Sequence, residues 1–177
     1  MPFSPPEQPQ VNLLRPSLAR IRKYLYLVHF YPNATLKGMV NGLEDVIHFS
    51  ASRVSIDSGS FDEVTVDFVN SRESKPGKYT PGQVTLTVKA DEEGKVLDLI
   101  DTWKRLIYDP ETGAMFHPQH YECSMEIEFI TLSGQPVTRY KFVGLWLQTP
   151  PTIDLDYSAS EDIELDLTMK YRYYVKA

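Results

Sequence analysis

Apolar and polar side chains alternate along much of this chain. The segments that show this pattern, or are rich in β-branched and aromatic residues, are 20–30, 46–55, 63–69, 84–89, 123–131, 137–148 and 161–175. A period of two is typical of strands that bury one face. We therefore expect a mainly β protein.

The last of these segments is unusually long. About thirteen residues alternate up to Val175, and at about 3.3 Å per residue they would form a strand near 45 Å long. Strands usually have five or six residues. A strand of this length suggests a sheet that is shared between subunits.

One segment has helical periodicity instead. Within 91–108, apolar residues recur at i, i+3, i+4 and i+7, which predicts one buried helix face. Asp91 suits the N-cap, and the segment from Asp109 to Gly113 should end the helix. The apolar positions are Val96, Leu99, Ile100, Trp103, Leu106 and Ile107.

The connection Asn70–Gly82 holds two Pro-Gly pairs and four charged residues. This composition predicts a long exposed hairpin loop rather than a tight turn. Together these elements predict two packed antiparallel sheets, a β-sandwich or barrel, with one flanking α-helix. We expect a single β domain over residues 11–177, preceded by a proline-rich N-terminal arm over residues 1–10.

The amino-acid composition narrows the class of protein. The 177 residues suit one domain, and a lone cysteine, Cys123, cannot form an internal disulfide. The net charge is −6, with +4 over residues 1–40 and −10 over the remainder, which argues against tight wrapping of nucleic acid. No apolar run is long enough to span a bilayer, and the N-terminus lacks the features of a signal peptide.

Candidate chemistry is sparse. His117, His120 and Cys123 have a spacing that could bind zinc, but no fourth ligand lies near them and Pro118 argues against a shared helical face. A polar loop entering a strand is the preferred interpretation. Nucleophile and nucleotide-binding motifs are missing. We therefore predict no enzyme, no catalytic residue, no metal and no cofactor.

Carboxylates are paired at a spacing of two in three places: Glu126/Glu128, Asp154/Asp156 and Glu164/Asp166. A glycosidase needs two carboxylates across a cleft, one with a raised pKa. These pairs instead follow regular strand alternation, which favours a solvated acidic face. If subunits close into a ring, such a face could line a channel.

The last third of the chain resembles the C-terminal region of tail tube proteins of contractile-tailed bacteriophages. The residues that carry the resemblance are Gly144–Leu147, Thr149–Pro151, Ile153–Tyr157 and the strand ending at Lys170–Tyr174. Arg15-Pro16-Ser17 is similar to that family's lead-in to the first strand. Leu147 departs from the family, which usually has proline there, and the FHPQHY loop has no counterpart.

The resemblance implies hexameric rings that stack into a hollow tube through which DNA passes. It implies a structural virion protein, assembled in the host cytoplasm without inserting into a membrane. Implied partners are further copies, a tail sheath protein, a baseplate or tube initiator and a tail terminator. Expected inter-ring contacts are Arg72, Glu73, Lys75, Lys78 and Tyr79, and candidate lumen-facing acids are Glu126, Glu128, Glu164 and Asp166.

Four alternatives remain open. The chain could be a baseplate tube initiator or the tube subunit of a phage-derived injection system, both within the same class. In another class, it could be a monomeric β-barrel that binds a small ligand. A zinc enzyme is the most distant alternative.

Overall fold

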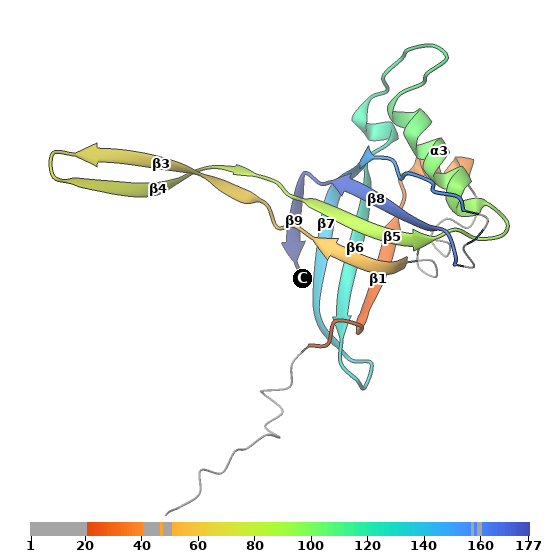
Figure 1. The fold of residues 1–177 in the computed structure, drawn as a ribbon, viewed down its shortest axis with the longest axis horizontal. Coiled ribbons are helices and arrows are strands. Elements are labelled where there is room, and N and C mark those ends of the chain that lie inside the picture. The colour runs from red at the N-terminus through yellow and green to blue at the C-terminus, as the bar shows by residue number, and fades with distance from the viewer. Residues whose placement is uncertain (1–20, 41–46, 48–50, 157, 159–160) are drawn as a thin grey trace, which may run out of the picture.

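A computed structural model describes residues 21–40, 47, 51–156, 158 and 161–177 (Figure 1). The protein is mainly β, as predicted. The proline-rich arm, the Arg15-Pro16-Ser17 lead-in and the domain boundary at residue 11 lie outside the described residues. The elements are β1 (Tyr26–Tyr31), α1 (Ala34–Met39), β2 (Ala51–Ile56), β3 (Ser60–Phe68), β4 (Ser71–Thr80), β5 (Gln83–Lys89), α3 (Lys95–Ile107), the 3-10 helix η2 (Pro118–His120), β6 (Cys123–Ile130), β7 (Pro136–Thr149), β8 (Glu164–Lys170) and β9 (Tyr173–Lys176).

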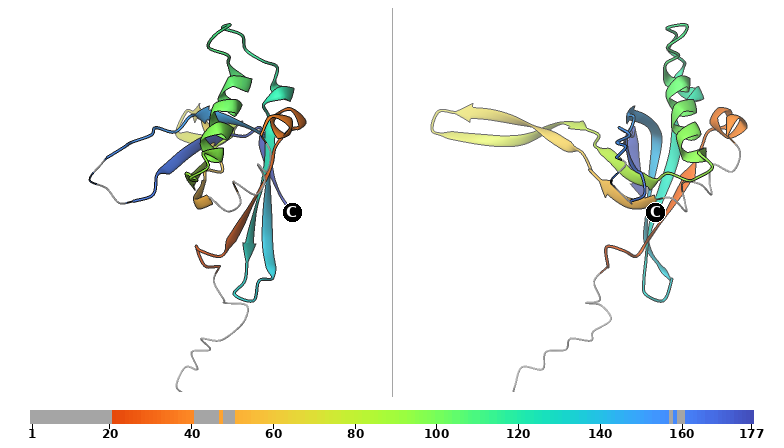
Figure 2. Two further views of the ribbon diagram at one scale, coloured as in Figure 1. Left: turned by 90° about the vertical axis from the view of Figure 1, so that its right-hand side faces the viewer. Right: turned by 45° about the vertical axis from the view of Figure 1, so that its right-hand side comes forward.

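Seven antiparallel strands form two packed layers that share β7 (Figure 2). The strand order is β1-β6-β7-β8-β5-β2, and β9 pairs with β7. The first part of β7 pairs with β6 and β9, and its last residues pair with β8. Between them stands Gly144, whose φ of +70° favours glycine. A Cβ there would lie 3.0 Å from Cβ of Arg172, so the position is also crowded for a larger residue.

The core lies between the layers, and α3 packs against it. The predicted apolar stripe of this helix is confirmed, because Val96, Leu99, Ile100, Trp103 and Leu106 are buried. The Trp103 ring contacts Phe30 edge-on at 5.5 Å between centroids, and its Nε1 donates to the carbonyl of Tyr121 at 2.8 Å. The large indole therefore ties α3 to β1 and to the segment before β6.

The helix begins at Lys95, four residues after the predicted N-cap. Asp91 still satisfies two free amides of the first turn, since its carboxylate accepts from the backbone N of Val96 at 2.9 Å and of Lys95 at 3.1 Å. These hydrogen bonds hold the pKa of Asp91 below its ordinary value. The helix ends at Ile107, as the Asp109–Gly113 segment predicts.

The prediction of a long loop over Asn70–Gly82 is wrong. Ser71–Thr80 is strand β4, paired with β3 in a two-stranded ribbon that turns at Val69-Asn70. The register shifts at Pro76-Gly77, where the pairing passes from Phe61 with Tyr79 to Glu63 with Pro76. An outer strand with such an irregularity accepts proline, so pairing with β3 outweighs the loop-like composition of β4.

The single long strand predicted over 161–175 is also wrong. The chain forms β8, leaves it at Tyr171-Arg172 and forms β9 in the other layer. The backbone N of Arg172 donates to the carbonyl of Val143 at 3.0 Å, while the Tyr171 hydroxyl donates to the carbonyl of Asp57 at 2.8 Å. The buried phase shifts by one residue at the break, because Tyr171 is buried, Tyr173 is exposed and Tyr174 packs against the core.

Two smaller differences concern the first part of the chain. The strand predicted over 20–30 begins only at Tyr26, and the helix α1 was not predicted. Asn33 begins α1 by accepting a hydrogen bond from the backbone N of Leu36 at 2.8 Å. Of the strand predicted over 46–55, the described residues place β2 at Ala51–Ile56.

Candidate assembly surfaces

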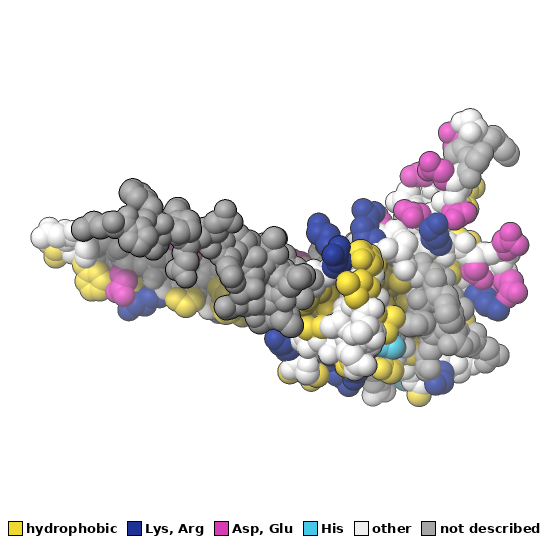
Figure 3. All heavy atoms as spheres, turned by 90° about the horizontal axis from the view of Figure 1, so that it is seen from below, with side chains coloured by type: hydrophobic (Ala, Val, Ile, Leu, Met, Phe, Trp, Pro, Cys, Tyr) yellow, Lys and Arg dark blue, Asp and Glu magenta, His cyan; other side chains and the backbone are white. Residues whose placement is uncertain are grey.

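The β3–β4 ribbon projects far beyond the two-layered body (Figures 1 and 2). Alternation puts Val64, Val66 and Phe68 of β3 on one face of the ribbon, where their exposed fractions are 49, 38 and 56%. We call these three residues the apolar stripe. Seen from below, hydrophobic side chains run along the ribbon and acidic ones gather at the opposite end of the molecule (Figure 3).

The base of the ribbon is fixed to the body. The Tyr79 hydroxyl donates to the carbonyl of Ser58 at 2.6 Å, and the Tyr79 ring contacts Phe61 at 5.1 Å between centroids. The Tyr171 hydroxyl donates to the Asp57 carbonyl and accepts from the backbone N of Gly82 at 3.3 Å. Burial raises the pKa of Tyr171 to about 12. The hydroxyl of Tyr171 therefore keeps its proton and can bridge both strands where they leave the body.

All five predicted inter-ring residues lie on β4. Arg72 stands near the turn and pairs with Asp67 at 2.6 Å, while Lys75 pairs with Glu73 at 3.5 Å. Tyr79 lies instead at the base. The apolar stripe is not among the predicted contact residues, although the alternation in 63–69 indicates it.

Glu126 and Glu128 lie on the outer face of the layer formed by β1, β6, β9 and the first part of β7. Their side chains are only 12 and 11% exposed, so the prediction of a solvated face is wrong for this pair. Glu128 accepts from Arg139 at 2.7 Å, and Glu126 pairs with Lys141 at 3.2 Å. The β6–β7 register places these cations directly opposite, which balances the buried carboxylates.

Glu164 and Asp166 lie on the outer face of the other layer. Both are exposed, so a solvated face is confirmed for this pair. Asp166 accepts from the Thr87 hydroxyl at 2.5 Å, and Thr87 also contacts Nε of Arg53 at 3.5 Å. The register adds Lys89 and Lys170 to the same face. The two acid pairs therefore lie on outer faces of different layers, and this face mixes both signs of charge.

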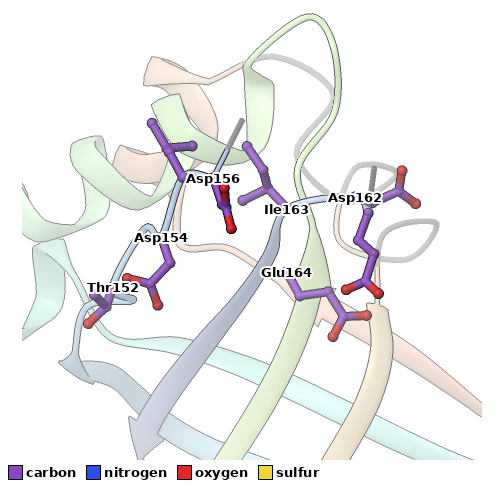
Figure 4. A pocket seen from close by; sticks show the side chains of 8 residues that line it. Thr152, Asp154, Asp156, Asp162, Ile163 and Glu164 are labelled. Carbon is purple, nitrogen blue, oxygen red and sulfur yellow. The ribbon is translucent and has the colours of Figure 1, made fainter. Parts of the chain in front are cut away.

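The third acid pair borders an open cleft of about 780 Å³ (Figure 4). Asp154 and Asp156 lie on one side of it, and Asp162, Ile163 and Glu164 lie on the other. Lys89 donates to Asp162 at 2.8 Å, which lowers the pKa of that carboxyl. The cleft is therefore lined by both apolar and acidic side chains, and its geometry assigns it no chemistry.

The suspected zinc ligands give no metal site. Within the residues that the structure describes, no group of three His, Cys, Asp or Glu side chains is arranged to hold a metal ion. Cys123 is buried and its thiol lies 3.5 Å from the carbonyl of Tyr121. Burial raises the pKa of Cys123 to about 12, so the thiol stays protonated and is a poor nucleophile or ligand.

In the described part of the chain, no helix has the length and apolar character needed to cross a membrane.

Comparison with known proteins gives a result for structure alone. No protein-family model matches the chain, and neither does any curated protein. Several solved structures do match, and each of the following aligns with 90% of this chain. In the sheath-tube complex of the extracellular contractile injection system PVC, a chain aligns with a TM-score of 0.66 and 13% identity over 93% of its own length.

Two structures of the anti-feeding prophage are similar. A chain of its tube-terminating cap gives a TM-score of 0.65 at 12% identity, covering 90% of our chain and 91% of its own. A chain of its six-fold symmetrised baseplate gives 0.64 at 12% identity, covering 90 and 96%. At these identities the similarity concerns the fold. The chain has the fold of the tube proteins of contractile injection systems.

Proposed function

We propose that the protein is a structural subunit of the tube in a contractile phage tail or a phage-like injection system. Copies form hexameric rings, and the rings stack into a hollow conduit. The observation that carries this proposal is the fold match, which covers 90% of this chain and 93% of its PVC counterpart. Head-to-tail contacts between identical chains close into rings when the rotation permits, and they propagate when it does not.

The ribbon is the proposed contact between stacked rings. It extends beyond the body and exposes the apolar stripe, a surface that isolated soluble proteins usually cover. Full burial of each such side chain contributes about 1.5–3 kcal/mol. The β4 residues Arg72, Glu73, Lys75, Lys78 and Tyr79 supply polar contacts along the same ribbon.

The outer face bearing Glu164 and Asp166 is the proposed wall of the channel. It is solvated, whereas Glu126 and Glu128 are nearly buried and neutralised by Arg139 and Lys141. The two pairs lie on different layers, so we assign the wall to one pair only. The face carries acids beside Arg53, Lys89 and Lys170, so neither DNA nor another cargo would bind it tightly.

Outside the channel, the proposed partners are a sheath, a baseplate or initiator, and a terminator. In a phage the assembled protein would belong to the virion and be built in the host cytoplasm. A tube subunit of an injection system is favoured as the second candidate, because two of the matched assemblies are PVC and the anti-feeding prophage. A ligand-binding barrel gains no support, since side chains such as Phe142, Met125 and Leu167 fill the interior.

Negative-stain electron microscopy tests the proposal. The purified chain is imaged at high concentration, with and without fragments of assembled tails as seeds. We expect six-fold rings or hollow tubes, because tube subunits polymerise on a template. Single rings that never extend would indicate the initiator. Monomers that ignore the seeds would contradict a tube role.

A further inference from the structure

The cleft before β8 exposes apolar side chains of its own. Leu155 and Ile163 line it, with exposed fractions of 78 and 36% (Figure 4). One of its carboxylates, that of Asp162, forms an ion pair within the described part of the chain, with Lys89 at 2.8 Å. We call this surface the acidic cleft. Its remaining lining residues are Thr152, Asp154, Asp156, Glu161 and Glu164.

The acidic cleft and the ribbon lie at opposite ends of the molecule. The segment that leads into β8 runs along the end of the body away from the ribbon (Figure 1), and acidic side chains gather at that end (Figure 3). Two copies in the same orientation, displaced along the ribbon, therefore bring the ribbon of one copy toward the cleft of the other. Such a contact joins two different surfaces and can repeat from copy to copy.

The ribbon matches the acidic cleft in chemistry. The β3–β4 register places Lys75 opposite Val64, so Lys75 lies on the same face as the apolar stripe. The strand β4 carries three cations, Arg72, Lys75 and Lys78, against the single acid Glu73, a net charge of +2. The ribbon therefore combines apolar and cationic groups, and the cleft combines apolar and anionic ones.

The charges already present on the ribbon leave this match intact. Glu63 and Asp67 of β3 alternate with the apolar stripe, so they project from the other face of the ribbon. Lys75 pairs with Glu73 at 3.5 Å, but both side chains are more than half exposed. An exposed pair of this kind contributes little. Lys75 is therefore available to the carboxylates of a second copy.

We propose that the apolar stripe of one copy occupies the acidic cleft of a copy in the adjacent ring. The inference rests on the proposed function, because it requires stacked rings, and it names the surface that receives the ribbon. Leu155 and Ile163 then contact the stripe, while Lys75 approaches the carboxylates around them. One contact removes both exposed apolar groups from water, which is its main source of stability.

A substitution on the receiving side tests the inference. Leu155→Ser removes apolar surface from the acidic cleft without adding charge, so stacking should need about tenfold more protein. The matched control is Leu132→Ser in the β6–β7 turn, where the leucine is 73% exposed, and stacking should then need the same concentration as the unchanged chain. Sedimentation of assembled tubes measures both. Equal behaviour of the two variants overturns the inference.

Disulfide trapping in the full chain tests the contact directly. Phe68→Cys is combined with Leu155→Cys or with Ile163→Cys, and each protein is oxidised gently under assembly conditions. We expect at least one combination to give a ladder of covalent oligomers on a non-reducing gel. Phe68→Cys with Leu132→Cys is the control and should give none. Native Cys123 stays in place because it is buried and protonated.

The outcomes separate this inference from the proposed function. Electron microscopy of the same samples shows whether tubes form. Tubes without a ladder in either combination overturn the inference and leave the tube role intact. A ladder without tubes supports the contact and contradicts the tube role, and the absence of both removes both.

Discussion

The body and the ribbon share the same alternating pattern, but the apolar face is buried in the body and exposed in the ribbon. In the body, strands such as β5 and β8 turn their apolar side chains into a shared core. In the ribbon, β3 alternates equally well, but its apolar stripe faces solvent. An isolated two-stranded ribbon is marginally stable in water. The difference teaches that a pattern specifies a buried face without saying whether the same chain covers it.

The body should respond most strongly to loss of core packing. Phe142→Ala removes a fully buried ring that contacts Tyr171 and Tyr174, and it should lower the free energy of unfolding by about 3–5 kcal/mol. Urea denaturation followed by tryptophan fluorescence measures this. A loss below about 1 kcal/mol would mean that the core can collapse around the site.

A substitution in the ribbon should weaken assembly and leave folding stability unchanged. Phe68→Asp places a charge in the apolar stripe, so we expect tube stacking to need at least tenfold more protein, while the melting temperature of the monomer stays within about 2 °C. Thr65→Asp, on the other face of the ribbon, is the matched control. If both variants stack alike, or if Phe68→Asp unfolds the monomer, the contrast between ribbon and body is lost.

The charged face of the body should show an intermediate effect. Arg139→Ala leaves Glu128 without its 2.7 Å partner in a nearly buried place, and it should cost about 1–2 kcal/mol of folding stability. Arg139→Lys keeps the charge and should recover part of the loss. Thermal unfolding compares the three proteins, and an unchanged Arg139→Ala variant would mean that solvent reaches Glu128.

The smallest expected effect is that of the carboxylate before α3. Asp91→Ala should cost about 1 kcal/mol at pH 7, because two amides of the first turn lose their acceptor. The folded pKa of Asp91 is lowered, so its contribution is present above the unfolded value of about 3.9 and is lost as pH falls through the folded pKa. Unfolding at pH 7 and pH 3 checks this. The exposed neighbour Glu92, replaced by alanine, should show no comparable difference.

The elements that depend only on residues close together in the chain could be predicted from the sequence. The buried face of helix α3 could be predicted from helical spacing alone. Strand β5 could be predicted from its run of β-branched residues. β4 was missed because pairing with β3, and not its own composition, makes it a strand. The break at Arg172 was missed because Tyr171 and Tyr173 continue the apolar alternation in the sequence, although Tyr173 is exposed and Tyr174 packs against the core instead.

The candidate site shows the same division. The exposed state of Glu164 and Asp166 followed from alternation. The burial of Glu126 and Glu128 did not, because it depends on the β6–β7 register that sets Arg139 and Lys141 opposite them.

The way Tyr171 holds the base of the ribbon has a mechanical consequence. β3 leads out of β2 and β4 leads into β5, and β5 lies between β2 and β8. A pull on the ribbon would reach the body along these strands and load the hydrogen bonds of β5 in shear, many at once. The Tyr171 bridge to Asp57 and Gly82 keeps the two strands from separating one bond at a time at the point where the load enters. The ribbon is therefore anchored in a way that resists a pulling force along its length.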